Sequence, residues 1–538
     1  MHVSAVRLAV WLACLALSAG PAPPAIDPGS VVNGASRMPS SLAGGALARG
    51  GRFSLSGVRL GPPRGVQGSE TDPPAALDGV CVHVAQGQTE IPAGLLFVSA
   101  ERIEGLIPRS APLGPVRLTV VYDGRASEPY PVTLVDSSFG FFTAETAPEA
   151  LPAARQPLSA APGETMALWG AGLGAAQPEI FVGGKPAGRG RRAGEEACCK
   201  GVDRIEFQIP ANAPQGCYVP VQARAGGRPS NVIGIAIHPV GRACRDQVDW
   251  FPDSVRQAAR AGFVVLARIS LQARATAGSD AGYQFDYAVA SFGKQQSGQR
   301  PFPPLPPFGS CAVVTQRINL RQVFAEARDP RAWTAIPEPT PGNLGLDAGP
   351  SIALAGPAGI RVLRGAARRR AVYDALLGGE VPLERIPKTP LYLRPGVYTL
   401  TSAGGPDIGP FTARVEAQRL IQWKNRSRLA EVRRSAGVTV EWKEARRSDA
   451  VLIAAASADH VTGDSALCVC LAYAKDRRFT IPPISLGNLP PTGDDDPEPG
   501  FLLLSELPLL PPVRIQARGL DAAFATFLSA NARVARFR

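Results

Sequence analysis

Histidine is the scarcest of the residue types in this sequence that could do chemistry. The 538 residues contain four histidines, and the three beyond the first twenty residues are His83, His238 and His460. A Ser-His-Asp hydrolase needs one of these, and the sequence lacks the G-x-S-x-G turn that usually presents the serine. His83 and His238 fall in alternating strand patterns. The sequence therefore predicts no catalytic triad.

Carboxylate pairs offer the one enzymatic alternative. A glycoside hydrolase needs two carboxylates about 5–10 Å apart across a cleft. Asp347, Asp407, Asp464 and Asp521 fall at expected strand ends or turns of the last part of the chain. Aspartate is also common at turns for a structural reason, because it accepts hydrogen bonds from nearby backbone amides. We therefore expect a protein that is not an enzyme and keep hydrolysis as an alternative.

Neither metal nor cofactor binding is predicted. Zinc sites need spaced clusters of cysteine and histidine, and no second pair matches Cys468 and Cys470. Gly170, Gly172 and Gly174 resemble a phosphate loop, but Pro178 and a strand pattern follow where a helix is required. The acidic run 494–498 has Pro499 where a calcium loop needs glycine. We expect a turn between strands and a solvated acidic loop.

The N-terminus predicts export. Arg7 precedes an apolar core over 8–17 and a small-residue cleavage context at 16–18, which is typical of a signal peptide over residues 1–20. Ten apolar residues are too few to cross a bilayer, so we expect no spanning segment.

The net charge of the chain is +12, but its arginines are scattered along the sequence, with local runs only at 189–192 and 368–370. Nucleic acid is therefore not an expected partner.

Export gives the cysteines a structural meaning. Cys14 leaves with the signal peptide, and an even number in an exported chain implies disulfides. The candidates are Cys198, Cys199, Cys217, Cys244, Cys311, Cys468 and Cys470, and Cys81 has no assigned partner. Cys217 and Cys244 fall at one pole of an expected three-stranded meander, so they form a candidate pair. Cys198 and Cys199 fall at the other pole unless their loop folds back, and either Cys468 or Cys470 could reach Cys311.

Short alternating apolar runs between Gly and Pro turns predict an all-β fold. One stretch occurs twice: 107–114 (IPRSAPLG) and 209–216 (IPANAPQG), each followed by Gly-Arg-x-Ser, at 124–127 and 227–230. The repeat predicts two tandem modules about a hundred residues apart. Short helices are expected at 253–261 and around 320–327, where apolar residues keep helical spacing.

Each module resembles an IPT/TIG domain, an immunoglobulin-like sandwich. The resemblance rests on Gly170 to Gly174, on Val-Gly-Gly-x-Pro-Ala at 182–187, on the Ile-Pro strand ends and on Ser230-Asn231. The stretch 28–36 (PGSVVNGAS) and the cysteine-rich 198–244 also resemble large families of uncharacterised secreted bacterial proteins. The resemblance implies tandem Ig-like modules and brings no catalytic residue.

These observations divide the chain into a signal peptide (1–20), module 1 (28–135), a linker (136–162), module 2 (163–245), a mixed β, short-helix and Pro-rich connecting region (246–343) and a C-terminal β domain (344–538). We expect this last domain to be a third, larger β-sandwich. We expect a secreted or envelope-associated, non-enzymatic protein for binding, adhesion or structure. Extracellular polysaccharide or another surface protein is the expected partner. The alternatives are a carbohydrate-active hydrolase with its site in the C-terminal domain, and a polyanion-binding surface protein.

Overall fold

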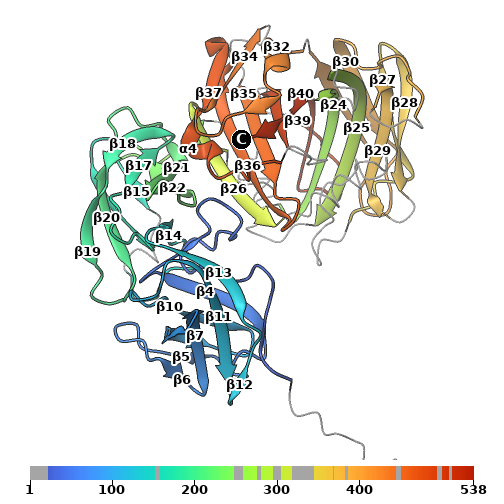
Figure 1. Cartoon of the computed structure of the whole chain (residues 1–538). Coiled ribbons are helices and arrows are strands. Elements are labelled where there is room, and N and C mark those ends of the chain that lie inside the picture. Colours follow the sequence, from blue (N-terminus) through green and yellow to red (C-terminus); the bar gives the residue numbers. More distant parts are fainter. Residues whose placement is uncertain are drawn as a thin grey trace, which may run out of the picture.

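The computed structural model describes residues 22–151, 158–247, 258–274, 280–294, 305–317, 345–366, 369–381, 386–418, 420–443, 450–493, 500–507 and 512–538. Four sequence expectations fall wholly or mostly outside these residues. They are the signal peptide, most of the helix at 253–261, the helix around 320–327 and the acidic run 494–498. Within the described residues the fold is all-β, as predicted (Figure 1).

Module 1 is a two-sheet sandwich. One sheet has the order β1 (Ala25–Ile26), β4 (Arg52–Val58), β10 (Arg102–Leu106), β9 (Gly94–Val98) and β5 (Val66–Gln67), with β2 (Val32–Asn33) also on β4. The other has the order β3 (Leu47–Ala48), β13 (Tyr130–Val135), β11 (Gly114–Tyr122), β7 (Val80–Gln86) and β6 (Ala76–Leu77), with β12 (Arg125–Ala126) and β8 (Thr89–Pro92) at its margins. Alternate residues such as Val80, Val82 and Val84 are fully buried between the sheets.

Module 2 repeats this plan. Its first sheet runs β14 (Gly140–Phe141), β16 (Thr165–Ala171), β20 (Asp203–Gln208), β19 (Arg191–Glu195). Its second runs β15 (Ser159–Ala160), β23 (Ile233–Ile237), β21 (Gly216–Ala225), β17 (Glu179–Val182), β18 (Lys185–Arg189), with β22 (Arg228–Pro229) on β21. Ile205, Phe207 and Ile209 face the core, as their alternation predicts.

The two copies of the repeat occupy equivalent places. The N–H groups of Ile107 and Ile209 donate to Gly51 and Glu164, and their carbonyls accept from Gly50 and Gly163. The hydroxyl oxygen of Ser127 accepts from the N–H of Val120 at 3.0 Å, and that of Ser230 accepts from Ala223 at 2.9 Å. The repeated serine thus fastens the same turn back onto the same strand in both modules.

A 13-stranded sheet is the largest sheet in the rest of the described chain. Its order is β26 (Ser310–Arg317), β36 (Asp464–Tyr473), β35 (Ala450–Ala458), β38 (Phe501–Leu507), β40 (Ala522–Val534), β24 (Arg260–Arg274), β25 (Asp280–Lys294), β29 (Arg369–Glu380), β28 (Gly359–Ala366), β27 (Ser351–Gly356), β30 (Gly396–Ser402), β31 (Phe411–Ala417), with β39 (Val513–Arg514) on β40. Three of its strands, β24, β25 and β26, come from the region interpreted above as a connection. They pair with strands of the C-terminal part, while the domain boundaries themselves stay a proposal.

Two apolar cores lie against this sheet. One lies between the long central strands and β27 to β31, with Phe292, Tyr373 and Tyr398 inside it. The other lies beneath a small sheet of β32 (Gln422–Trp423), β34 (Val438–Lys443) and β37 (Arg478–Ile481), and beneath the pair β33 (Glu431–Val432) and β41 (Arg536–Phe537). Trp423 and Trp442 are both buried in this second core, where their rings supply a large apolar surface.

Helices are short in the described residues: α4 (Pro483–Leu486) and the single turns η2 (Arg426–Arg428) and η3 (Ala474–Asp476). The described end of the helix predicted at 253–261 is wrong, because β24 begins at Arg260 and pairs with both β25 and β40. None of the described helices has the length and apolar character needed to cross a membrane.

Candidate functional site

The described residues contain three disulfides. Cys217 is joined to Cys244, the pair that the meander favours. Cys311 on β26 is joined to Cys470 on β36, and Cys198 is joined to its own neighbour Cys199. Cys81 and Cys468 carry free thiols.

Strand register explains why Cys470 rather than Cys468 reaches Cys311. Cys470 lies directly opposite Cys311 in the antiparallel pairing, whereas Cys468 lies opposite Val313. Of the two alternatives for Cys311, the structure has Cys470 as the partner, and Cys468 carries a free thiol. Its Sγ still lies 3.8 Å from that of Cys470, and the three sulfur atoms all lie within 4.8 Å of one another. Burial raises the pKa of the Cys468 thiol to about 12, which keeps it protonated and unreactive.

The vicinal disulfide Cys198–Cys199 sits in a compact double turn between β19 and β20. The N–H of Cys199 donates to the carbonyl of Glu196, and that of Val202 donates to the carbonyl of Cys199. The Glu196 side chain accepts from the indole N–H of Trp169 at 2.8 Å. Cys199 is fully buried, whereas Cys198 is half-buried. The sequence showed two adjacent cysteines, but not that they bond to each other.

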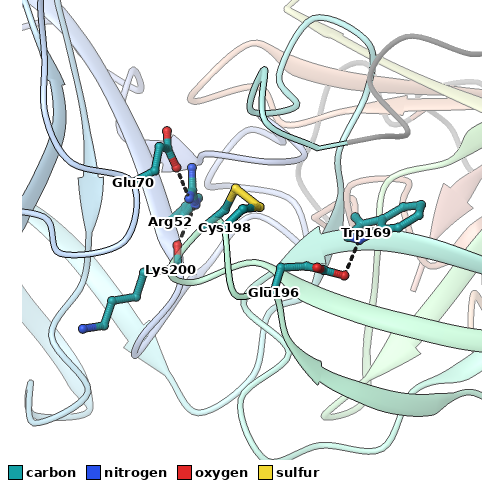
Figure 2. Close-up of a disulfide and its surroundings, with 7 residues drawn as sticks. Arg52, Glu70, Trp169, Glu196, Cys198 and Lys200 are labelled. Atoms are coloured by element: carbon teal, nitrogen blue, oxygen red, sulfur yellow. Dashed lines mark hydrogen bonds and ion pairs between the residues drawn. A yellow bond between two sulfur atoms is a disulfide. The ribbon is translucent and has the colours of Figure 1, made fainter.

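The residue after the disulfide joins module 2 to module 1 (Figure 2). The N–H of Lys200 donates to the carbonyl of Glu70 at 2.8 Å, and its carbonyl accepts from Nε of Arg52 at 2.9 Å. Arg52 also pairs with the Glu70 carboxylate at 2.5 Å, and the Arg52 side chain is only 7% exposed. A Cβ on Gly201 would lie 2.4 Å from Leu106 of module 1. The turn is therefore packed tightly against the first module.

A second set of buried contacts completes this joint, and it uses the PGSVVNGAS stretch. Asn33 is 1% exposed, and its amide nitrogen donates to the carbonyls of Ser138 and Ala171. Its amide oxygen accepts from the backbone N–H groups of Ala35 and Ser36. One buried side chain thus satisfies backbone groups of both modules, which gives this sequence stretch a structural role.

The Gly-x-Gly-x-Gly stretch lies at the same joint. Gly172 and Gly174 have φ of +87° and +60°, and a Cβ on Gly172 would lie 2.6 Å from the Ser138 carbonyl oxygen. β16, which contains Gly170, ends at Ala171, and the next strand is β17, so the glycines form a turn between strands as predicted. Close backbone approach, rather than phosphate binding, accounts for the glycines here.

Module 2 also contacts the large sheet domain. The side-chain amide of Asn488 donates to the carbonyl of Ser230 at 3.0 Å, and Asn488 is 1% exposed. Ser41 of module 1 donates to the carboxylate of Asp464 at 2.6 Å. Asp464, one of the candidate catalytic carboxylates, is therefore a buried contact between two parts of the chain.

The other candidate carboxylates gather around one loop cluster. Oδ2 of Asp407 accepts from the N–H of Asp347 at 2.9 Å, and Oδ1 of Asp347 accepts from the N–H of Gly349 at 2.8 Å. Asp521 accepts from the N–H of Arg260, whose side chain reaches the carbonyl of Asp407. Asp347 and Asp407 thus lie together, and these hydrogen bonds join the loops that carry the aspartates.

The three histidines are not brought together. His83 lies on β7 of module 1, where Nδ1 is 2.8 Å from Glu90. His238 follows β23 of module 2 and contacts the carbonyl of Pro239, and His460 lies between β35 and β36. Each belongs to a different part of the fold.

Sequence reasoning missed a buried ion pair on the central strands. Asp286 is fully buried and accepts two hydrogen bonds from Arg268, at 2.6 and 2.7 Å. It also accepts from the N–H groups of Tyr392 and Leu393 at 2.7 Å. On the opposite face, burial raises the pKa of Asp374, which accepts from the hydroxyl of Tyr287 at 2.8 Å. Arg268 and Asp286 each stand between apolar residues in the sequence, and this pattern could have indicated a charged pair inside a strand-rich core.

Module 1 has a half-open cavity of about 260 Å³ beside β13. It is lined by Val31, Ser40, Gly45, Ala46, Leu47, Pro115, Tyr130, Pro131, Val132 and Thr133. The Tyr130 hydroxyl accepts from the N–H of Gly29 at 2.6 Å, which fixes one wall. The lining combines apolar surface, one aromatic ring and two hydroxyl side chains, a mixture found in small-ligand sites.

No protein-family model matches the sequence, and no curated protein matches it. Among solved structures, SGBP-B of a Bacteroides ovatus mixed-linkage glucan utilization locus, in complex with a mixed-linkage heptasaccharide, has a TM-score of 0.20 and 11% identity. That match covers 36% of this chain and 45% of the other, so it spans under half of that protein.

Two further structures are similar. SGBP-B from a complex xyloglucan utilization locus in Bacteroides uniformis has a TM-score of 0.16 and 12% identity over 69% of this chain and 89% of the other. The titin Ig tandem domains A164-A165 have a TM-score of 0.14 and 10% identity over 36% and 90%. Such low scores support no statement about function. The architecture itself defines a multidomain all-β protein with Ig-like sandwich modules.

Proposed function

We propose that this chain is an exported, non-enzymatic protein that presents a binding surface or a structural spacer in the cell envelope or outside the cell. Its two modules are of the IPT/TIG kind, and its partner is an extracellular polysaccharide or another surface protein. The single observation that carries the proposal is the joint between the modules, where Asn33, Arg52 and Lys200 fix two sandwiches side by side through buried contacts.

The joint supports a scaffold role for a physical reason. A buried polar side chain is costly unless all its groups are paired, so Asn33 and Arg52 disfavour alternative placements of the two modules. Modules that are fixed in this way hold any ligand surface at a constant position and orientation relative to the rest of the chain. The cavity beside β13 is the ligand surface we propose, since its lining fits a small or extended ligand.

A polysaccharide array with the mature protein tests this proposal, run beside a reducing-end hydrolysis assay on the same glycans. We expect binding without turnover. Thr133 lines the cavity and is exposed, so Thr133→Arg should weaken binding at least tenfold, whereas Thr412→Arg on the exposed face of β31 should leave it unchanged. Equal binding by both variants would place the ligand elsewhere.

A hydrolase remains the second candidate, because the structure brings Asp347 and Asp407 together. Release of reducing ends that is lost in Asp407→Asn would establish it and overturn the non-enzymatic proposal. Retention on immobilised heparin that collapses with modest salt would instead favour a polyanion partner.

A further inference from the structure

We propose that the Cys198–Cys199 disulfide is a site of reversible reduction, and that its redox state sets how firmly module 2 is seated on module 1. The proposal rests on three observations: the position of the disulfide, the contacts of the residue that follows it and the unequal burial of its two cysteines. It goes beyond the proposed scaffold role and does not depend on any ligand.

Global stability is a poor explanation for this disulfide. The chain entropy that a cross-link removes from the unfolded state grows with the loop it closes, and adjacent residues close the shortest loop possible. Cys217–Cys244 and Cys311–Cys470 have sequence separations of 27 and 159. A cross-link between neighbours therefore acts mainly on local backbone shape.

The local shape it fixes is the contact with module 1. A bond between neighbouring side chains forces both onto one side of the backbone, whereas neighbours in an extended chain point to opposite sides. The next residue is the one that bridges the modules: the N–H of Lys200 donates to the carbonyl of Glu70, and its carbonyl accepts from Arg52. Opening the ring frees the backbone directly before these two hydrogen bonds, so it weakens them.

The disulfide also lies at the centre of the joint. Cys199 is part of a small buried cluster with residues from both modules, and Cys198 packs against it. The buried members are Ala35 and Phe142, Leu151, Ala171, Cys199 and Val202. A change in the conformation of this pair therefore reaches the apolar contact as well as the polar one.

The difference in burial predicts which sulfur reacts. An external thiolate can approach the half-buried Cys198 more readily than Cys199, which is 0% exposed. Attack on Sγ of Cys198 forms a mixed disulfide and breaks the Cys198–Cys199 bond, and Cys199 leaves as a thiolate that takes up a proton. The second thiol of a dithiol reductant then attacks the reductant's first sulfur, which is bonded to Sγ of Cys198 in the mixed disulfide. This attack releases the Cys198 thiolate, which is protonated in turn. Two electrons and two protons pass from the dithiol to the protein.

Hydrogen exchange of the full mature chain tests the proposal. Graded dithiothreitol, followed by alkylation and peptide mass mapping, gives the order in which the three disulfides open. We expect Cys198–Cys199 to open before the buried Cys311–Cys470. Once the pair is reduced, exchange of the Lys200 amide should quicken at least tenfold, because its hydrogen bond to Glu70 weakens.

Three variants make the outcome decisive. Cys198→Ser with Cys199→Ser should show the fast Lys200 exchange without reductant, and Cys217→Ser with Cys244→Ser should not. Gly201→Val, which clashes with Leu106 while leaving the disulfide intact, shows what a loosened joint looks like in this assay. Unchanged Lys200 exchange in a sample whose Cys198 and Cys199 are shown by mass to be reduced would overturn the proposal, even if the double-serine variant fails to fold.

Discussion

Two disulfides of this chain differ in almost every physical respect. Cys198–Cys199 joins neighbours at the contact between two modules, and Cys311–Cys470 joins two strands of one sheet with a sequence separation of 159. The first has one half-buried cysteine, Cys198, whereas the second is buried with Cys468 in an apolar core. The difference teaches that the same type of bond can fix local backbone geometry in one place and stabilise the whole fold in another.

The largest expected effect belongs to the long-range disulfide. Changing Cys311 and Cys470 together to alanine should lower the free energy of unfolding of the large sheet domain by about 5 kcal/mol, the chain-entropy value for a loop of this size. Urea unfolding, followed by the fluorescence of Trp442 in the same core, measures it. Cys468→Ala is the matched control, since it removes a buried sulfur and leaves the cross-link. An equal loss in the control would show that packing, not the cross-link, stabilises this core.

The second prediction asks whether the module joint depends on its polar contacts. Arg52→Met keeps the apolar stem but leaves the Glu70 carboxylate and the Lys200 carbonyl without this donor, so unfolding of the first two modules should become easier by about 2 kcal/mol. Arg49→Met is the control. Its pairing with Asp136 is solvent-exposed, with 35% and 63% of the two side chains accessible, so it should cost less than about 0.5 kcal/mol. Thermal unfolding of both variants measures the two losses. Equal shifts of the unfolding midpoint would show that Arg52 contributes no more than the exposed Arg49.

The third prediction concerns the buried thiol beside the long-range disulfide. Burial raises the pKa of Cys468 from 9.0 to about 12, so the unfolded chain loses this proton at lower pH than the folded chain does. Stability is therefore unaffected below about pH 9 and falls by up to about 1.4 kcal/mol per pH unit between the two pKa values. Urea midpoints of the wild type and Cys468→Ala, compared from pH 8 to pH 10.5, isolate this contribution. Parallel curves would show that the thiol is not protected from ionisation.

The sequence predicts strands well wherever one face of a strand is buried. Arg102–Leu106 and Tyr130–Val135 show why, because apolar and polar side chains alternate along both strands and the alternation reflects one core. The repeated Ile-Pro and Gly-Arg-x-Ser stretches also occupy the equivalent positions that the repeat predicts. Local patterns carry this information because they are set by neighbours within a few residues.

Pairing between distant segments was not predictable in the same way. The choice of Cys470 over Cys468 depends on the register of β26 against β36, and both cysteines share one strand face. The joint residues Asn33 and Arg52 read as ordinary polar residues of strands, since their partners in the linker and in module 2 lie more than a hundred residues away. The helix predicted at 253–261 was wrong at its described end, where pairing with two long strands overrides local helical preference.

The smallest thermodynamic effect should come from the vicinal disulfide. Cys198→Ala with Cys199→Ala should lower the free energy of unfolding of modules 1 and 2 by only about 1 kcal/mol, since the loop it closes is minimal. The same variant should nevertheless quicken exchange of the Lys200 amide, because that amide follows the ring and bonds to Glu70 across the joint. Urea unfolding and hydrogen exchange on one sample separate the two quantities. A loss as large as that expected for Cys311–Cys470 would contradict a purely local role, because the chain entropy of so short a loop is too small to account for it.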